Sequence, residues 1–330
     1  MKKSTDQEDK NVDLALRPAT WQEYVGQDAV KKNLRILIDA AKQRKESCDH
    51  ILFYGQAGLG KTTLAHLVAK EMGADIKITS GPTIEKTGDL ASILSGLNRG
   101  DILFIDEAHR INRMIEEVLY PAMETRKLHI IIGKGPAART LTLDLPPFTM
   151  VAATTRIGLL SNPLRSRFGA IFRLDYYQQK DIETILKRSG QLLGVEVGQD
   201  AIKVLARASR ATPRVANRLL KRARDYAQVH SAGAVTEEVA RQTLKLLDID
   251  DVGLDMQDRR LLESIIKKYA GGPVGLRSLA ASLSEEVDTI EDVYEPYLMN
   301  LGFLERTSKG RVATSLAYRH LGLKERGQLF

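Results

Sequence analysis

The first segment that could carry out chemistry is a glycine-rich loop at residues 55–62, with the sequence GQAGLGKT. Its spacing, G-x-x-x-x-G-K-[ST], is that of a phosphate-binding loop, and it lies between an apolar run and a helical pattern, as such a loop requires. Glycines such as Gly58 and Gly60 let backbone N–H groups surround a phosphate, and the helix N-terminus adds a favourable field. The motif predicts that Lys61 contacts the β- and γ-phosphates of a nucleotide and that the Thr62 hydroxyl binds Mg²⁺.

A second motif supplies two carboxylates. Residues 101–109 read DILFIDEAH, an apolar run that ends in Asp106 and Glu107, which is the Walker B pattern. We expect Asp106 to hold Mg²⁺, usually through water, and Glu107 to orient and deprotonate the attacking water. The letters DEAH also occur in superfamily 2 helicases, but such a helicase needs a second half of strands and helices. Because nothing after Tyr176 alternates strand and helix, that class is excluded.

Three further features could contact the nucleotide. Thr155 lies in the run AATTR at the end of the fourth strand-like segment, where a polar side chain can reach the γ-phosphate or the water. Arg165 and Arg167 lie in PLRSRFG before the last strand-like run, a place that suits an arginine finger, which stabilises transition-state charge. Arg214 lies in the first turn of a helix, where a cation opposes the helix dipole, and contact with the nucleotide phosphates would explain it.

The first half of the chain alternates strand-like and helical patterns. The strand-like runs are near-continuous, as expected of strands buried on both faces of a parallel sheet, and cover residues 50–54, 75–79, 101–105, 149–154 and 170–174. Helical patterns cover residues 28–44, 61–72, 89–96 and 114–125. This alternation predicts an α/β fold. Residues 128–143 contain two strand-like segments around the turn GKGPAA and predict a β-hairpin that projects from the core.

The second half of the chain is mainly helical. Helices are expected at residues 181–193, 200–210, 213–229 and 236–247, and the acidic segment DIDDVG at 248–253 marks a boundary. Beyond it, helices at 258–269, 276–283 and 289–300 precede two strand-like segments at 302–306 and 311–315. Three helices followed by a hairpin predict a winged helix, with a small helical bundle as the alternative. The expected domains are residues 1–176, 177–250 and 251–330.

Composition and charge exclude several classes of protein. The chain has 330 residues, of which 43% are hydrophobic, so it is not mainly disordered, collagenous or of low complexity. Its formal net charge of +7 is a weak sign of a polyanionic partner. One cysteine, Cys48, permits no intrachain disulfide and fits a reducing intracellular compartment. The polar N-terminus is no secretory signal, and no apolar run approaches the ~20 residues of a membrane helix. A cytoplasmic protein is expected.

These motifs together resemble the AAA+ ATPases, and within them the RuvB family of bacterial Holliday-junction branch-migration motors. The Walker motifs alone would indicate only a P-loop ATPase. Three segments are more specific: GKGPAAR in the hairpin, TPRVANRLL, and the final stretch from GGPVGL through TIEDVYEPYL to GF. The resemblance runs from about Leu16 to Leu323, and it implies an AAA+ P-loop core with a parallel sheet, a helical lid and a C-terminal winged helix.

The resemblance also implies a role for each matching position around the nucleotide. Leu16 and Arg17 would line the base and ribose, and Tyr177 would lie near the nucleotide at the domain junction. A subunit edge that bears the nucleotide would be formed by Glu124, Thr125 and Arg126. The phosphates of ATP and Mg²⁺ would be held by Gly58, Gly60, Lys61, Thr62, Thr63 and Asp106.

The family further implies a homohexameric ring, in which one subunit completes the nucleotide site of the next. Thr155 would be the residue called sensor 1, Arg167 the arginine finger given to the neighbouring subunit, and Arg214 sensor 2. Nucleotide hydrolysis would then drive branch migration on four-way DNA junctions, in homologous recombination and DNA repair. The hairpin at 128–143 would dock on RuvA, with the RuvC resolvase as a further partner.

DNA contacts are expected in the third domain. Its predicted third helix, residues 289–300, suits a phosphate-lined groove poorly, because it carries Glu291, Asp292 and Glu295, and Pro296 would kink it. The wing is basic instead, so we expect sequence-independent phosphate contacts from Arg306, Lys309 and Arg311. The family often has an arginine that contacts DNA where this chain has Val287, so the wing would carry more of the binding.

Two other readings stay open on the sequence alone. One is another DNA-associated AAA+ ATPase, a clamp loader or a replication initiator; the former usually ends in a helical collar and the latter carries a sequence-reading helix. The other is a nucleotide-switched DNA-binding regulator. Glu107 and Arg167 count against a pure switch, which needs neither a base nor a finger.

Overall fold

The computed structural model describes residues 15–132, 139–231 and 233–324. The chain forms two compact units, Met1–Tyr177 and Gln178–Phe330. We call the first the P-loop unit. The second contains a helical part, the lid (residues 178–247), and a C-terminal part, the head (residues 255–324).

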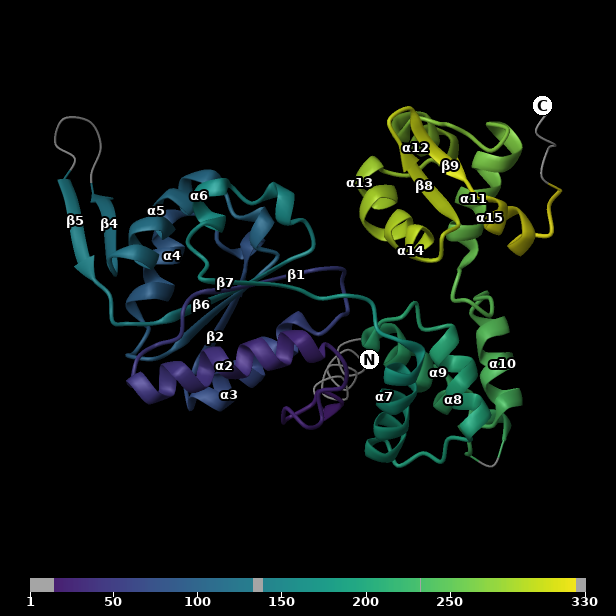
Figure 1. Ribbon diagram of the computed structural model, residues 1–330, viewed down its shortest axis with the longest axis horizontal. Coiled ribbons are helices and arrows are strands. Elements are labelled where there is room, and N and C mark those ends of the chain that lie inside the picture. The colour runs from purple at the N-terminus through teal and green to yellow at the C-terminus, as the bar shows by residue number, and fades with distance from the viewer. Residues whose placement is uncertain (1–14, 133–138, 232, 325–330) are drawn as a thin grey trace. The chain divides into compact units, whose positions relative to one another are not determined.

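A parallel sheet is the centre of the P-loop unit (Figure 1). Its five strands in the described chain lie in the order β2-β3-β6-β1-β7, with bounds β1 Ile51–Tyr54, β2 Ile76–Ser80, β3 Ile102–Asp106, β6 Thr149–Thr154 and β7 Ala170–Arg173. β6 pairs with β3 on one side and with β1 on the other. All five predicted strands are confirmed to within a residue or two. Their carboxyl ends lie at one edge, which is where the three nucleotide motifs begin.

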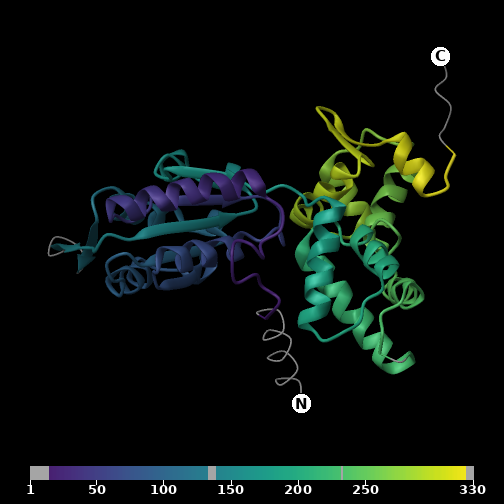
Figure 2. The ribbon, with the colours of Figure 1, turned by 60° about the horizontal axis from the view of Figure 1, so that its bottom comes forward.

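Helices cover both faces of this sheet (Figure 2). Their bounds are α2 Asp28–Arg44, α3 Lys61–Met72, α4 Thr87–Ser95 and α5 Arg113–Glu124, close to the predicted ranges. α4 and α5 pack on the face that includes Leu52, Leu103 and Met150, whereas α2 and α3 lie on the other face. Shorter helical turns complete the unit: η1 Gly81–Thr83, η2 Ala108–Arg110, η4 Ile157–Leu159 and α6 Asn162–Arg165.

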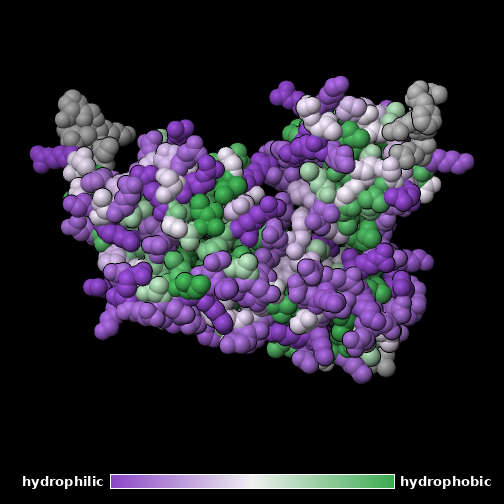
Figure 3. All heavy atoms as spheres, viewed as in Figure 1, coloured by the Kyte–Doolittle hydropathy of each residue, from purple (hydrophilic) through white to green (hydrophobic). Residues whose placement is uncertain are grey.

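The predicted hairpin is present as β4 Lys127–Ile132 and β5 Arg139–Asp144, paired antiparallel. Its GKGPAA tip lies outside the described residues. Large apolar side chains also reach the surface of the P-loop unit, among them Ile36 of α2 and Ile171 of β7, which are 60% and 43% exposed. Figure 3 shows hydrophobic side chains gathered on one face of this unit. An apolar surface of this kind is typical of proteins that assemble.

The lid consists of four helices in the described chain, near the predicted ranges: α7 Gln179–Leu192, α8 Gln199–Arg207, α9 Pro213–His230 and α10 Glu237–Leu246. The head follows with α11 Met256–Lys268, α12 Leu276–Leu283, α13 Val287–Thr289, η5 Ile290–Tyr294, α14 Glu295–Asn300, β8 Leu304–Thr307, β9 Gly310–Ala313 and α15 Ser315–His320. Among the residues with described structure, no helix is long and apolar enough to span a membrane.

The third helix of the head is present and is irregular near Pro296, as expected. The chain is helical without a break from Val287 to Asn300, but Ile290–Tyr294 form a π-helical segment between two α-helical ones. The cause is Pro296, which has no N–H to donate to the carbonyl four residues earlier, and the wider π turn lies directly before it. The short helix α15 after the wing was not predicted.

Candidate functional site

The glycine-rich loop joins β1 to α3 and starts at the centre of the sheet edge. The Gly55 N–H donates to the Thr154 carbonyl at the end of β6, 3.2 Å away, which fixes the start of the loop. Gly60 is the N-cap of α3 with a φ of 97°, and a Cβ there would lie 2.7 Å from the Tyr24 hydroxyl. The first turn of α3 contains no acidic residue, so its N–H groups face an anion without a competing charge.

Lys61 is folded over the loop that precedes it. Its Nζ donates to the carbonyls of Gly55 and Gln56, at 2.7 and 2.8 Å, and the residue is only 8% exposed. Thr62 and Thr63 are half-buried in the same first turn of α3. An ammonium group and two hydroxyls thus lie beside the backbone of the loop and the first turn of α3.

The carboxylates lie at the end of β3, one strand from β6. Asp106 is half-buried, and its Oδ1 accepts the Glu107 N–H at 2.9 Å. Glu107 has a φ of 48° and turns out of the strand, which leaves its side chain 51% exposed. Gly81 makes room for this turn, because a Cβ there would lie 2.4 Å from the Glu107 carbonyl. Glu107 Oε2 pairs with Arg110 at 3.2 Å, an exposed ion pair that is readily exchanged.

Sequence reasoning missed a contact between the β3 and β6 ends. The Thr154 hydroxyl lies 3.0 Å from His109 Nδ1 and accepts the Arg156 N–H at 3.0 Å. Thr155, the predicted sensor, therefore lies between Thr154, which contacts the His109 side chain after the Walker B pair, and Arg156, which is hydrogen-bonded to Thr154. The signal for this contact was the His of DEAH, although its partner is 45 residues away.

Two tyrosine hydroxyls form hydrogen bonds to the backbone of the glycine-rich loop. Tyr24 and Tyr177 both donate to the Leu59 carbonyl, at 3.3 and 3.2 Å, and the two hydroxyls lie 3.2 Å apart. Burial raises the pKa of Tyr24 well above its usual value, with Tyr177 contributing. Tyr177, the last residue of the P-loop unit, thus contacts the glycine-rich loop. Tyr24 makes a second contact with the loop, which the sequence motifs did not indicate.

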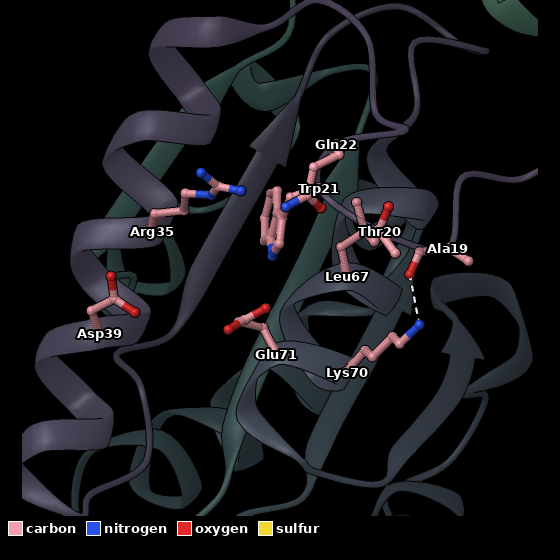
Figure 4. A pocket seen from close by; sticks show the side chains of 9 residues that line it. All are labelled: Ala19, Thr20, Trp21, Gln22, Arg35, Asp39, Leu67, Lys70 and Glu71. Carbon is pink, nitrogen blue, oxygen red and sulfur yellow. Dashed lines mark hydrogen bonds between the residues drawn. The ribbon is translucent and has the colours of Figure 1, made fainter.

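The segment that carries Leu16 and Arg17 is anchored to α3. Leu16 is buried and Arg17 is exposed, and the charge of Arg17 adds to burial in lowering the pKa of His66 on α3. Lys70 Nζ donates to the Ala19 carbonyl at 2.9 Å, as the dashed line in Figure 4 shows. A cavity of about 470 Å³ lies beside this anchor, with Trp21 at its centre between α2 and α3. It is lined by the far end of α3, so it is separate from the phosphate-binding turn.

Arg167 is held by its own chain. Its Nη2 lies 3.0 Å from Glu124 Oε1, its Nη1 donates to the Pro163 carbonyl at 2.6 Å, and its guanidinium lies 4.5 Å from the Tyr120 ring centre. Its Nε is buried, and among the described residues it has no hydrogen-bond partner. Glu124 is 54% exposed. The predicted finger and the predicted subunit edge are therefore neighbours in one chain, with one donor of the guanidinium unused.

The other two residues of that edge lie at the base of the hairpin. Arg126 donates to the Phe148 carbonyl at 2.7 Å and its guanidinium lies 4.9 Å from the Phe148 ring centre, and burial lowers its pKa. The Thr125 hydroxyl donates to the Pro121 carbonyl at 3.0 Å. In the second unit, Arg214 is exposed in the first turn of α9, where no acidic residue competes for it.

The wing arginines have partners in the head itself. Arg306 Nη2 and Arg311 Nε each lie 2.6 Å from the carboxylate of Glu295, which is fully buried. Glu291 adds weaker contacts to both arginines, at 3.3 and 3.8 Å. Two of the three acids that made the third helix look unsuited to DNA, Glu291 and Glu295, therefore face the wing and pair with its arginines. Of the three predicted DNA contacts, Arg311 has only 13% of its side chain exposed, whereas Arg306 is 43% exposed and Lys309 is exposed at the wing turn.

Comparisons with known families match nearly the whole chain. The model described as the Holliday junction DNA helicase RuvB P-loop domain matches residues 16–174, the RuvB AAA lid domain matches 177–250, and the RuvB C-terminal winged helix domain matches 251–322. Proteins from two strains of Chloroflexus aurantiacus, each called Holliday junction branch migration complex subunit RuvB, are 57% identical over 319 residues. That alignment covers 97% of this chain and 91% of theirs.

Solved structures agree with these matches. Thermotoga maritima RuvB, described as a Holliday junction branch migration motor, is 49% identical, with a TM-score of 0.86 over 94% of this chain and 99% of its own. A point variant of the same protein gives a TM-score of 0.87 over the same shares. These similarities confirm the predicted architecture of a P-loop AAA+ domain with a parallel sheet, a lid and a winged helix.

Proposed function

Because this chain belongs to the RuvB family, we propose that it is an ATP-driven motor that moves the branch point of Holliday junctions in recombination and repair. The observation that carries this proposal is the meeting of three motifs at one sheet edge. The glycine-rich loop follows β1, the Walker B carboxylates follow β3, and Thr155 follows β6, the strand between them. This arrangement supports binding and hydrolysis at one phosphate-binding turn.

In this proposal the substrate ATP lies with its phosphates on the first turn of α3. The N–H groups of that turn and Lys61 bind the phosphates. Mg²⁺ fits the donors present, because the Thr62 hydroxyl and the Asp106 carboxylate are the oxygen ligands it prefers. When bound, Mg²⁺ neutralises charge on the β- and γ-phosphate oxygens. Glu107, exposed and turned out of β3, takes a proton from the attacking water, and Thr155 holds the water or the γ-phosphate.

The remaining negative charge of the transition state is stabilised by a residue of a neighbouring subunit in a homohexameric ring. Arg167 is the finger, and its pair with the exposed Glu124 is weak enough for a phosphate to replace. Exposed apolar side chains on the P-loop unit support such an assembly. Arg214 at the start of α9 reports the nucleotide state to the lid, and Leu16, Arg17 and Tyr177 hold the base and ribose.

DNA binding follows from the wing, and partner binding from the hairpin. Lys309 and Arg306 are the accessible cations of the wing, and we assign them to duplex phosphates at the junction, with Arg311 setting the shape of the wing. The β4–β5 hairpin docks on RuvA, a partner that the relatives' name as subunits of a branch migration complex supports. RuvC is a further expected partner, and the cytoplasm is the expected compartment.

A synthetic four-way junction with RuvA and ATP tests this function. We expect strand separation by branch migration with the wild-type chain and none with Glu107→Gln, which still binds nucleotide. Glu117→Gln, an exposed glutamate on α5, is the matched control and should behave as wild type. Hydrolysis of ATP by the wild-type chain without movement of the junction would show that the chain is an ATPase of another kind.

A further inference from the structure

The turn between α8 and α9 has an unusual conformation for residues that are not glycine. Arg210 and Ala211 have φ values of 53° and 51°, so two consecutive residues adopt the left-handed conformation, which is costly for side chains with a Cβ. Buried hydroxyls hold the turn in place: Ser209 donates to the Ala206 carbonyl at 2.7 Å, and Thr212 donates to the Ser209 carbonyl at 3.3 Å. The turn is therefore fixed by its surroundings, and the side chain of Arg210 leaves the lid.

Arg210 contacts three elements of the head. Its Nη1 donates to Asp258 Oδ2 of α11 at 2.8 Å, and its Nη2 donates to the Val293 carbonyl of η5 at 3.2 Å. Its guanidinium lies 4.7 Å from the ring centre of Tyr297 on α14. Asp258 is fully buried, and Arg210 has only 16% of its side chain exposed. Arg210 is always charged, and a mostly buried guanidinium that loses its partners is strongly unfavourable, so this contact holds its geometry.

The chain segment between lid and head packs against the same turn. At Gly253, a Cβ would lie 2.6 Å from the Ala208 carbonyl, so the segment approaches the turn more closely than any other residue type allows. The Tyr297 hydroxyl donates to the Val252 carbonyl at 2.5 Å, and His320 lies 2.8 Å from Asp250. Lid and head accordingly belong to one compact unit, Gln178–Phe330.

The position of Arg210 in the sequence places this contact close to the predicted nucleotide-sensing residue of the lid. It lies four residues before Arg214: Arg210 precedes α9, which begins at Pro213, and Arg214 lies in the first turn of that helix. We propose that Arg210 is a positioning residue that couples nucleotide-dependent movement of the lid at Arg214 to the DNA-binding head. This inference rests on the proposed function. In this proposal the turn at 208–212 transmits rotation of the lid to the head. Lid and head then move as one body during each ATP cycle.

The test separates coupling from folding by measuring two rates on the full chain. With RuvA, ATP and a synthetic four-way junction, Arg210→Gln should hydrolyse ATP without DNA as the wild type does. It should move the junction about tenfold fewer times per ATP hydrolysed, the size of a typical coupling between two sites. Arg210→Lys keeps the charge but loses the forked geometry, and should lie between the two. Lys203→Gln, which removes an exposed ion pair with Asp200 within α8 of the lid, is the matched control.

A distance measurement gives a readout that does not depend on activity. Spin labels on Val229→Cys in the lid and Arg319→Cys in the head report the spread of lid-to-head distances by pulsed electron resonance. Cys48 is buried and burial raises the pKa of its thiol to about 11, so the labels attach to the introduced cysteines. We expect a single narrow distribution in the wild type, with or without ATP, and a broad one in Arg210→Gln.

Two results would overturn the inference. One is junction movement per ATP in Arg210→Gln equal to that of the control Lys203→Gln, whatever the distance distribution. The other is an equal fall of ATP hydrolysis and junction movement in Arg210→Lys, which would indicate a structural role only. Failure of the wild-type chain to move the junction would instead contradict the proposed function itself, so the two failures are distinguishable.

Discussion

Two clusters of arginine and carboxylate lie in different parts of this chain and differ in one physical respect. In the P-loop unit, Arg167 pairs with Glu124, which is 54% exposed. In the head, Arg306 and Arg311 pair with Glu295, which is fully buried. A carboxylate that is mostly in water gives up an ion pair at little cost, whereas a buried carboxylate cannot lose its partners without a large cost. Arg167, itself only 19% exposed, can therefore leave Glu124 for a phosphate, whereas Arg311, 13% exposed, stays with Glu295. Arg306 keeps its pair with Glu295 but is 43% exposed, so it can still bind a phosphate at the surface.

The largest effect that tests this contrast is expected at Arg167. Arg167→Ala should lower ATP hydrolysis by about 10³-fold or more, the usual contribution of an arginine finger, while nucleotide affinity changes little. The free energy of unfolding should fall modestly, because only 19% of the Arg167 side chain is exposed and its guanidinium packs on Tyr120. Steady-state hydrolysis, a fluorescent-nucleotide titration and chemical denaturation measure the three quantities. Arg165→Ala, which removes a hydrogen bond from the guanidinium to the Asn162 side chain, is the control. Equal hydrolysis by the two variants would remove the finger assignment.

The buried cluster should respond in the opposite way. Glu295→Gln leaves two wing arginines without their charged partner, and we expect a loss of about 3 kcal/mol in the free energy of unfolding. ATP hydrolysis without DNA should stay unchanged, because the residue lies in the head. Chemical denaturation of Glu295→Gln beside Glu305→Gln, an exposed glutamate on β8, measures the difference. A loss of stability no larger than that of the control would mean that Glu295 does not hold the wing.

Acidification should weaken the P-loop unit through a buried histidine. His50 lies between the Met123 carbonyl and the Met150 N–H, and burial lowers its pKa from 6.5 to about 4. On acidification, His50 takes up a proton in the unfolded chain at a higher pH than in the folded one. The free energy of unfolding is therefore unaffected by His50 above pH 6.5 and falls as the pH drops from 6.5 towards 4, by about 3 kcal/mol in all. Thermal unfolding against pH measures this loss. His50→Gln, which can keep both hydrogen bonds without titrating, should show a flatter profile over that range.

The smallest effect is expected at the wing turn. Lys309→Ala should weaken junction binding modestly and uniformly across sequences, and should reduce the slope of log affinity against log salt by about 1. Lys267→Ala, an exposed head lysine paired with Glu263, is the control and should leave that slope unchanged. Binding titrations at several salt concentrations give the slope. An unaltered slope in Lys309→Ala would place the DNA contacts elsewhere in the head.

The sequence predicted the elements better than their contacts. The strands of the sheet are readable because each is a short apolar run buried on both faces, and α2 and α3 match their predicted ranges because their periodicity has clear ends. The glycine-rich loop and the Walker B pair are contiguous motifs, so their place at the sheet edge follows from the strand order. Pro296 indicated a kink, but the π turn before it is a detail that only backbone geometry reveals.

Contacts between distant residues could not be predicted in the same way. Arg311 and Glu295 are 16 residues apart, and Arg210 and Asp258 are 48 apart. The same residue types appear on solvated surfaces throughout the chain, so type and spacing do not say which of them become buried. For this reason the sequence assigned Arg311 to DNA, although its guanidinium is paired with a carboxylate inside the head. For the same reason the sequence did not indicate the contact of Tyr24 with the glycine-rich loop.

The central claim is that the P-loop unit binds ATP with its own residues but needs Arg167 of a neighbouring subunit to hydrolyse it. Mixing Lys61→Ala and Arg167→Ala chains, each inactive alone, tests this directly by ATP hydrolysis. The claim predicts that the mixture regains activity, because a Lys61→Ala subunit can lend its intact Arg167 to the intact loop of its neighbour. A mixture as inactive as its two components would show that Arg167 acts within its own chain, and would contradict the account.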